Sequence, residues 1–429
     1  MPLLKRLILA GAGVAIATAA SASVVAINQP AESVTAARIA ALPVAQRGPW
    51  SAYLARSAAQ MRADQAALAA ERAGLATIPA TPASGNGEAT MPLDREPAWY
   101  ASPEGRHVAD VILSFQTPAG GWGKNQPRNG DVRQKGQAYV ADNGLAHPSP
   151  NDFDASDAWH YVGTLDNDAT ITEIRFLARV GAAVPTREAA RYREAALRGI
   201  RYLLNAQFPN GGWPQVWPLE GRYHDAITYN DDAMTHALDL MSQIASGEKS
   251  FAFVPAEIRT RARASVARGL DCIIRTQVVV NGRRTGWGQQ HDALTLRMTS
   301  ARNYEPAELA SSESAALLVY LMQLLNPSPA VAAAVEAGVD WLRTTMIRDR
   351  VWSDANDGQG KRLQVQAGAP PVWARYYVAT SNTPIFGDRD KTLHDDVLEL
   401  SAGRRRGYAW FVTTPAAALT AYDRWKPQH

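Results

Sequence analysis

One local pattern recurs along the chain and constrains its fold more than any other feature of the sequence. An amphipathic segment ends in Gln, a turn that contains glycine follows, and a Trp closes the unit. The copies lie at 112–125, 203–216 and 273–290, the last with a longer insertion. Glycine at a helix end can adopt the left-handed conformation that closes the helix. Helix hairpins repeated in this way predict a ring of helix pairs, an (α/α) toroid, with its loops on one rim of a central cleft.

Between these units, apolar residues recur at spacings of three and four, as on one face of an α-helix. Such faces run through residues 171–178, 192–203, 234–244 and 315–322, whereas the alternation typical of strands is rare. We therefore expect an all-α fold of about eight to ten helices, an (α/α) toroid or barrel of helix hairpins. A substrate cleft is expected on the rim that carries the loops.

The N-terminus has the features of a secretory signal peptide over residues 1–26. A basic start precedes an uncharged apolar stretch, and Ala20-Ser21-Ala22 supplies a small-residue cleavage pattern. An uncleaved anchor helix is the alternative, because the apolar stretch is just long enough to span a bilayer. We expect export with cleavage, and hence a secreted or periplasmic protein that has no stable membrane association afterwards.

Residues 27–98 are expected to form an N-terminal extension and linker. A helical, Ala-rich segment at 49–75 is followed by a stretch that contains several prolines. This region either wraps around the main domain or forms a flexible tether. The strongly helical part, 99–429, is expected to be one catalytic domain.

Charge and cysteine content exclude several classes of protein. Lys and Arg number 44 against 41 Asp and Glu, which gives a formal net charge of +3. A nearly neutral chain is a poor candidate for general nucleic-acid binding, which needs a net basic field. The single cysteine, Cys272, cannot form an internal disulfide or a cysteine-based zinc site. We expect a monomer without a nucleic-acid partner.

Two clusters of Asp and Asn stand just before apolar-periodic helices. They are Asp166-Asn167-Asp168 and Asn230-Asp231-Asp232. Helix N-capping is one explanation, but a cap needs only one such residue. Crowded carboxylates repel one another unless a cation neutralises them, and oxygen ligands of this type suit Ca²⁺ or Mg²⁺. If the two clusters meet in the fold, they predict a shared site for a divalent metal.

Basic residues complement these acids if they lie on the same rim. Lys124, Arg302 and the run at 404–406 are the candidates, although a charge run is usually a solvated face. Arginine pairs bidentately with carboxylates, so a metal among guanidinium groups suits a substrate with repeated carboxylates. His291 beside Asp292 would be a general base with its orienting acid, and a structural histidine is an equal alternative.

Longer motifs occur in an order that resembles the pectate lyases of polysaccharide lyase family 10. The resemblance extends from about residue 100 to 412 and leaves the first 98 residues uncovered. Gly123 and Gly288 stand where the family usually has Pro and Cys. The motifs are GlyGlyTrpGlyLysAsn at 120–125, AspAsnAspAlaThr at 166–170, GlyGlyTrpProGln at 211–215, IleThrTyrAsnAspAspAlaMet at 227–234, TrpGlyGlnGlnHisAsp at 287–292, ArgAsnTyrGluPro at 302–306, PheGlyAspArgAsp at 386–390 and ArgArgGlyTyrAlaTrp at 405–410.

The resemblance implies a secreted pectate lyase that cleaves de-esterified α-1,4-polygalacturonate by Ca²⁺-dependent β-elimination and releases 4,5-unsaturated oligogalacturonates. Arg302 would be the catalytic base, with Lys124 as its rival. Ca²⁺ would bind at the acidic clusters, and the substrate beside them. The expected metal ligands are Asp166, Asn167, Asp231 and Asp232, and the expected substrate contacts are Lys124, Asn125, Trp213, Tyr304, Arg405 and Arg406, with either Arg405 or Arg406 holding a substrate carboxylate.

Other functions stay open at this point. Arginine is effectively always protonated in proteins, so a neutral Arg302 needs desolvation and nearby cationic charge. A glycoside hydrolase on the same helical scaffold would use two carboxylates among Asp166, Asp231, Asp232 and Glu305. A non-catalytic polyuronate-binding protein would bind without turnover. The Gln-x-x-x-Gly-x-Trp units also resemble those of triterpene cyclases, but the Asp-rich protonating motif of those enzymes is not found in the sequence.

Overall fold

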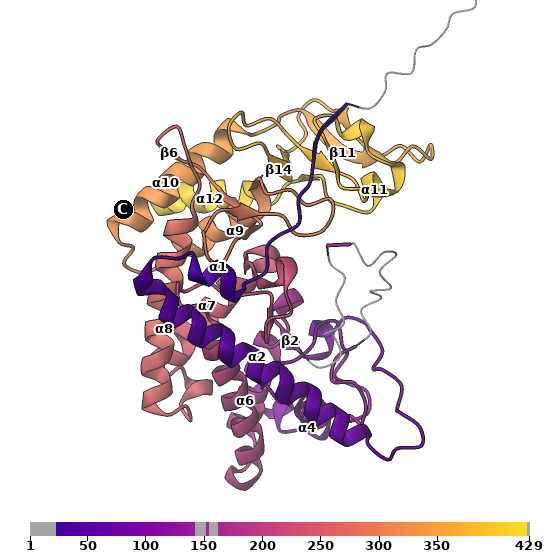
Figure 1. Ribbon diagram of the computed structural model, residues 1–429, viewed down its shortest axis with the longest axis vertical. Helices are drawn as coiled ribbons and strands as arrows, with labels where there is room; N and C mark the ends of the chain where they lie inside the picture. Colours follow the sequence, from indigo (N-terminus) through magenta and orange to yellow (C-terminus); the bar gives the residue numbers. More distant parts are fainter. Residues whose placement is uncertain (1–22, 142–151, 154–161, 427–429) are drawn as a thin grey trace, which may run out of the picture.

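The computed structural model describes residues 23–141, 152–153 and 162–426. The first 22 residues of the expected signal peptide lie outside this part of the chain. The main body consists of helix hairpins in two layers (Figure 1). The inner layer holds α5 (Ile171–Ala183), α7 (Ala233–Ser246), α9 (Ser311–Met322) and α12 (Pro415–Trp425), and the outer layer holds α4 (Pro103–Ser114), α6 (Thr186–Ala206), α8 (Ala256–Thr276) and α10 (Pro329–Thr344).

The repeated Gln and Trp side chains close the hairpins. Each Trp indole donates to a carbonyl near the end of the preceding outer helix, and each Gln amide bridges its own turn and the next outer helix. Trp373, after α10, is a fourth copy of the Trp. The indole bonds are Trp122 to Ile112 (2.7 Å), Trp213 to Leu203 (2.9 Å), Trp287 to Ile273 (2.8 Å) and Trp373 to Leu342 (2.7 Å). The bonds to the next outer helix are Gln116 to Ala195, Gln207 to Ser265 and Gln277 to Ala334, each of 2.9 Å.

The expectation of an all-α fold is wrong. In the described residues, the segments between the helices pair into seven small antiparallel sheets of two or three strands. Most strands are only two residues long, too short to show any alternation of apolar and polar residues, which is why the sequence pattern does not reveal them. The sheets are β2–β3, β4–β8–β9, β7–β10–β14, β13–β17, β11–β12, β5–β6 and β1–β16–β15. Their strands are β1 (Val24–Ile27), β2 (Gly163–Thr164), β3 (Val216–Trp217), β4 (Ile227–Thr228), β5 (Val279–Val280), β6 (Arg283–Arg284), β7 (Trp287–Gly288), β8 (Gln290–His291), β9 (Met298–Thr299), β10 (Leu309–Ala310), β11 (Arg350–Asp354), β12 (Lys361–Val365), β13 (Trp373–Ala374), β14 (Tyr376–Tyr377), β15 (Phe386–Gly387), β16 (Thr392–His394) and β17 (Phe411–Val412).

Two of these sheets join successive hairpin loops and so bring the acidic clusters together. Thr164 of β2 pairs with Val216 of β3, and Thr228 of β4 pairs with Gln290 of β8. Each pairing lies just before one of the Asx-rich segments. The loops therefore form one continuous surface at the ends of the inner helices.

The N-terminal extension packs against this body. Its strand β1 pairs with β16, and the long helix α2 (Val44–Arg72) crosses the hairpins in front of α6 (Figure 1). Tyr53 of α2 is buried and donates its hydroxyl to the carbonyl of Ala206 at 2.8 Å. The short helices α1 (Ala36–Ala40) and α3 (Pro97–Tyr100) flank α2 on either side in the chain.

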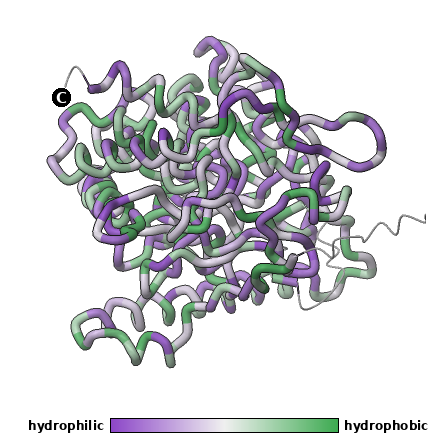
Figure 2. The backbone as a smooth tube through the Cα atoms, turned by 90° about the horizontal axis from the view of Figure 1, so that it is seen from above, coloured by the Kyte–Doolittle hydropathy of each residue, from purple (hydrophilic) through white to green (hydrophobic). Residues whose placement is uncertain are grey.

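Hydrophobic and hydrophilic segments alternate along the backbone (Figure 2). Accordingly, no helix among the described residues combines the length and the apolar character needed to cross a membrane. The buried hydrophobic side chains form one large cluster, to which the helices, several short strands and the N-terminal extension all contribute, and two small ones.

Candidate active site

The two Asx-rich segments form equivalent turns. The turn η3 (Asp166–Asp168) connects β2 to α5, and η5 (Asn230–Asp232) connects β4 to α7. In each turn, the second and third residues have φ between 49° and 59°. Asn and Asp tolerate this left-handed conformation better than other non-glycine residues. The left-handed backbone of these turns therefore explains part of their enrichment in Asn and Asp. Helix capping does not explain Asp232, because this N-cap residue of α7 makes no side-chain cap hydrogen bond.

Asp166 and Asp231 line the same cavity where the two turns approach each other, close enough for each carboxyl group to affect the ionisation of the other. Burial opposes the ionisation of Asp166, but its ion pair with Lys124 outweighs this effect and lowers its pKa to about 2. Desolvation raises the pKa of Asp231, and the adjacent Asp166 adds to the shift, so that this pKa is about 7. Two adjacent carboxyl groups in a buried site cannot both ionise easily without a cation beside them.

Arg302 forms a bidentate ion pair with Glu305. Its Nε and Nη2 donate to the two carboxylate oxygens at 2.9 and 2.6 Å. Glu305 is only 1% exposed, whereas the Arg302 side chain is 38% exposed and can contact a substrate. Burial alone would lower the pKa of Arg302, but the charge of Glu305 raises it well above its ordinary value. Before substrate binds, Arg302 is therefore held as a guanidinium, which is the opposite of what a base needs.

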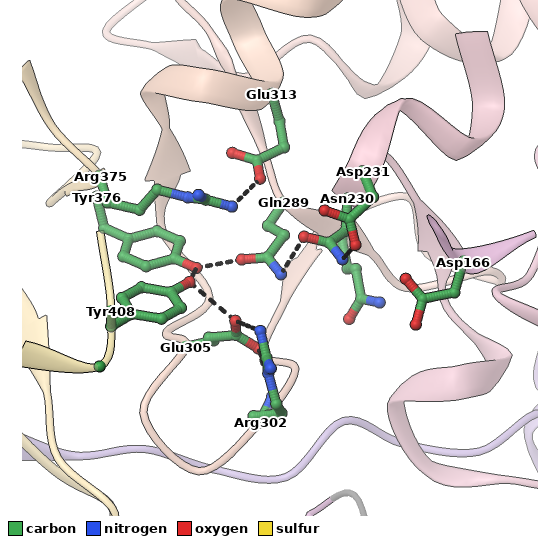
Figure 3. A network of polar contacts seen from close by, with 12 residues as sticks. Asp166, Asn230, Asp231, Gln289, Arg302, Glu305, Glu313, Arg375, Tyr376 and Tyr408 are labelled. Carbon is green, nitrogen blue, oxygen red and sulfur yellow. Dashed lines mark hydrogen bonds and ion pairs between the residues drawn. The ribbon is translucent and has the colours of Figure 1, made fainter. Parts of the chain in front are cut away.

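A chain of hydrogen bonds connects this ion pair to the acidic pair (Figure 3). The Tyr408 hydroxyl donates to Glu305 at 2.8 Å and lies 2.7 Å from the hydroxyl of Tyr376. Tyr376 bonds to Gln289, and Gln289 donates to Asn230 at 3.0 Å. Asn230 then donates to Asp231 at 2.7 Å. The positions of Arg302 and Asp231 are thus fixed relative to each other.

Arg375 adds a second guanidinium that the sequence analysis missed. It forms an ion pair with Glu313, whose side chain is 4% exposed, at the start of α9. Burial would lower the pKa of Arg375, but Glu313 raises it well above its ordinary value. The repeat contains a feature that could have identified Arg375, because Arg375 stands two residues after Trp373, the fourth repeated Trp. The residue two positions after each repeated Trp lines the site, and these residues are Lys124, Gln215, Gln289 and Arg375.

Three connected cavities surround Asp231, which lines all of them. The Arg302 cavity, of about 160 Å³, also contains Asp166 and Lys124. The Lys124 cavity, of about 570 Å³, extends from Lys124 toward the N-terminal extension. The Arg375 cavity, of about 660 Å³, follows α7, α9 and α12. Together the cavities form an extended cleft, which suits a polymeric ligand.

Other expected site residues lie around the same cleft. Asn167 donates to Asn125 at 2.9 Å, and both line the Lys124 cavity. Asp232 lines the Lys124 and Arg375 cavities. Tyr304, in contrast, lines none of the three cavities. Its ring centroid lies 5.2 Å from the guanidinium of Arg302 and 3.9 Å from that of Arg404. The metal-binding and substrate-binding roles of these residues stay predictions.

His291 is a structural residue. It is fully buried, accepts from the backbone of Gly288 at 3.0 Å and contacts the carbonyl of Leu296 at 2.9 Å. Burial lowers its pKa to about 4. Asp292 does not orient it, because Asp292 forms an ion pair with Arg38 of the N-terminal extension.

Three expected substrate contacts are placed elsewhere by the structure. Trp213 is fully buried and closes a helix end, so it cannot touch a substrate. Arg405 and Arg406 of α11 (Ala402–Arg406) donate to the carbonyls of Gln359 and Gly358 in the turn between β11 and β12. Neither arginine lines any of the three cavities. The arginine run fixes this hairpin turn, whereas Arg302 and Arg375 are among the arginines that line the cleft.

Replacing Trp213 by Ala is expected to destabilise the fold by about 3–5 kcal/mol, because a large buried ring and its hydrogen bond are lost together. Trp213→Phe should keep the fold with a smaller loss of stability and leave the activity per folded molecule unchanged. Chemical denaturation and activity assays on the same preparations measure both quantities. A large loss of activity in well-folded Trp213→Phe would instead favour a role in substrate binding.

Comparison with known proteins agrees with the family that the motifs indicate. A family model described as pectic acid lyase matches residues 116–419, and no curated protein matches significantly. A family 10 polysaccharide lyase from Cellvibrio cellulosa is 31% identical, with a TM-score of 0.63, over 74% of this chain and 91% of that protein. A mutant of a family 10 polysaccharide lyase from the same organism, in complex with trigalacturonic acid, is 30% identical, with a TM-score of 0.64, over 79% of this chain and 98% of that one. The chain therefore belongs to the pectic acid lyases of polysaccharide lyase family 10 and is a lyase.

Proposed function

We propose that the protein is an exported pectate lyase that cleaves de-esterified α-1,4-polygalacturonate by Ca²⁺-dependent β-elimination. One observation carries this proposal. The adjacent carboxyl groups of Asp166 and Asp231 lie in a cleft that also contains the guanidinium groups of Arg302 and Arg375. Guanidinium groups bind carboxylates bidentately, and a polyuronate carries one carboxylate on every sugar. The relative bound to trigalacturonic acid supports the same substrate class.

The acidic pair fits a Ca²⁺ ion that is shared with the substrate. Asp166 and Asp231 supply only oxygen donors, and the ion pair with Lys124 compensates Asp166. Burial and the adjacent Asp166 raise the pKa of Asp231, so a cation beside it would favour its ionised form. Among the described residues, no group of three or more His, Cys, Asp or Glu is arranged to hold a metal. Ca²⁺ takes six to eight oxygen ligands, so substrate and water would supply most of them. A bound Ca²⁺ would offset the negative charge that develops on the uronate carboxylate.

The protein side chains account for the rest of the reaction. Elimination breaks the C5–H and C4–O4 bonds and forms a C4–C5 double bond, while the leaving oxygen gains a proton from solvent. Arg375 would bind the carboxylate next to C5 and stabilise the carbanion-like transition state. Arg302, at the exposed end of its cavity, would take the C5 proton. Because Glu305 raises the pKa of Arg302, this step requires alkaline conditions or a weaker ion pair in the complex.

The position of β1 bears on where an exported chain would be cleaved. The strand begins at Val24 and pairs with His394, so cleavage after Ala22 would leave it intact, whereas cleavage after Ala26 would remove most of it. The intact mass of the secreted protein identifies the cleavage site.

The test of the function is a spectral assay of the secreted protein on de-esterified polygalacturonate, with Ca²⁺ or with a chelator. Absorbance near 232 nm, which marks the conjugated product, is expected to increase with Ca²⁺ and not with the chelator. New reducing ends without this absorbance would indicate hydrolysis and overturn the proposal. Tight binding without any product would indicate a binding protein instead.

The affinity for Ca²⁺ should depend on pH through Asp231. Since the pKa of Asp231 is about 7, a proton occupies it below this pH and must be displaced by the cation. The affinity is therefore expected to rise about tenfold between pH 6 and pH 8. Calorimetric titration with Ca²⁺ at the two pH values measures the change. The variant Asp231→Asn is the control, and an equal pH dependence in that variant would assign the effect to another group, such as His236.

A further inference from the structure

One wall of the Lys124 cavity lies outside the family match, which begins at residue 116. This wall belongs to the N-terminal extension and is formed by Gly85, Asn86, Gly87, Glu88 and Met91. We call residues 85–91 the N-terminal wall. The Lys124 cavity shares Lys124, Asn167 and Asp231 with the Arg302 cavity. A polymer that filled both cavities would therefore lie along the N-terminal wall.

The N-terminal wall is fixed to the loop that carries Lys124. The amide of Gly85 donates to the carbonyl of Asn125 at 2.7 Å, and Thr90 accepts from the amide of Arg128 at 2.8 Å. The Met91 side chain is buried. Arg128 is fully buried and forms an ion pair with Glu173 of α5 at 2.8 Å, which ties the same loop to the helix layer. The wall is thus a rigid part of the cleft.

The charges around this cavity do not favour an ionised sugar. Lys124 is paired with Asp166, and His236 is paired with Asp168. Glu88 and Asp232 also line the cavity. Asp232 shares the nearby His236 with Asp168, and Glu88 has no ion-pair partner in the part of the chain that the structure describes. A uronate carboxylate in the Lys124 cavity would therefore meet an excess of negative charge. A methyl ester carries no charge, and amides such as those of Asn86 and Asn125 can bond to sugar hydroxyls.

We propose that the N-terminal wall forms a sugar-binding subsite that prefers a methyl-esterified galacturonate to an ionised one, and that Glu88 determines this preference. The proposal rests on the proposed function, because it concerns a sugar of the same polymer away from the bond that is cleaved. The enzyme would then cut de-esterified positions that have an esterified neighbour more efficiently than fully ionised chains.

The test uses the full-length mature protein with Glu88 replaced by Lys. Glu88 is exposed, so the variant should fold. The control is Glu96→Lys, which makes the same charge change at an exposed position of the extension that does not line the cavity. The measured quantity is the ratio of kcat/KM for a partially methyl-esterified hexagalacturonate to kcat/KM for the fully de-esterified hexamer.

Glu88→Lys is expected to lower this ratio about three- to tenfold, as befits reversal of one exposed charge, and added salt should reduce the effect. Glu96→Lys should leave the ratio unchanged. If both variants change the ratio equally, the N-terminal wall is not a subsite, although the lyase function stands. If the wild-type protein forms no unsaturated product from any hexamer, the proposed function fails first.

Discussion

Replacing Arg302 by alanine is expected to lower kcat on polygalacturonate by about a thousandfold or more, with a smaller change in KM. The reason is that Arg302 is the exposed cation of the small central cavity, held in place by a buried carboxylate. In the wild type, the rate should continue to rise above pH 8, because the Glu305 ion pair opposes loss of the Arg302 proton. The initial rate at 232 nm between pH 7 and pH 11 measures both effects.

The variants Arg302→Lys and Glu305→Gln separate the possible roles of Arg302. Lysine keeps the positive charge but loses the bidentate geometry, so it should recover only a small part of the rate. Glu305→Gln removes the charge that raises the pKa of Arg302, so the pH profile should move to lower pH if Arg302 is the base. Activity of Arg302→Ala within tenfold of wild type would remove Arg302 from the mechanism and leave Lys124 as the candidate.

Replacing Asp231 by asparagine is expected to lower kcat/KM about a hundredfold to a thousandfold, because the acidic pair loses the charge that would attract Ca²⁺. The stability of the cation-free protein should change in the opposite direction. The raised pKa of Asp231 means that its ionisation destabilises the fold as pH rises from about 4 to 7. At pH 8 the variant should therefore be more stable than the wild type by up to about 1 kcal/mol. This figure already allows for the screening of the Asp231 charge by solvent.

Asp271→Asn is the matched control for this experiment. Asp271 lies on α8, its side chain is 63% exposed, and it pairs only loosely with Arg275 at 3.4 Å. Neither activity nor stability should change much in this variant. Thermal unfolding with and without Ca²⁺ checks the stability. If Asp231→Asn cleaves normally and still responds to Ca²⁺, then Asp166 and Asp231 do not hold the cation.

The sequence was sufficient to predict features that depend on local pattern. The helix hairpins followed from the periodicity and from the repeated Gln and Trp, because these residues make the same hydrogen bonds in each unit. The meeting of Asp166 with Asp231 could be expected because both clusters precede inner helices at equivalent places in the repeat. The charge of Arg302 made it one of several basic candidates, and only the family motif singled it out as the base.

Features that depend on contacts between distant segments could not be predicted in this way. The two-residue strands form only because neighbouring loops present paired backbone groups, so no local pattern marks them. Tryptophan is a residue type that often binds sugars, but the indole of Trp213 is buried and donates to the carbonyl of Leu203 at the end of α6. Arg405 and Arg406 were chosen for their charge, whereas the backbone carbonyls of a distant hairpin determine where they point.

The position two residues after each repeated Trp has a consequence for how such an enzyme can evolve. At these four positions the repeated indole holds the backbone, while the side chains hold the site together. Arg375 pairs with the buried Glu313, Lys124 pairs with Asp166, and Gln289 donates to Asn230. Lysine, glutamine and arginine all occur there in this chain. A single exchange at one of these places therefore alters the site and also leaves a partner unpaired, as Glu313 would be without Arg375. New ligand preferences at these positions would need a second exchange at the partner.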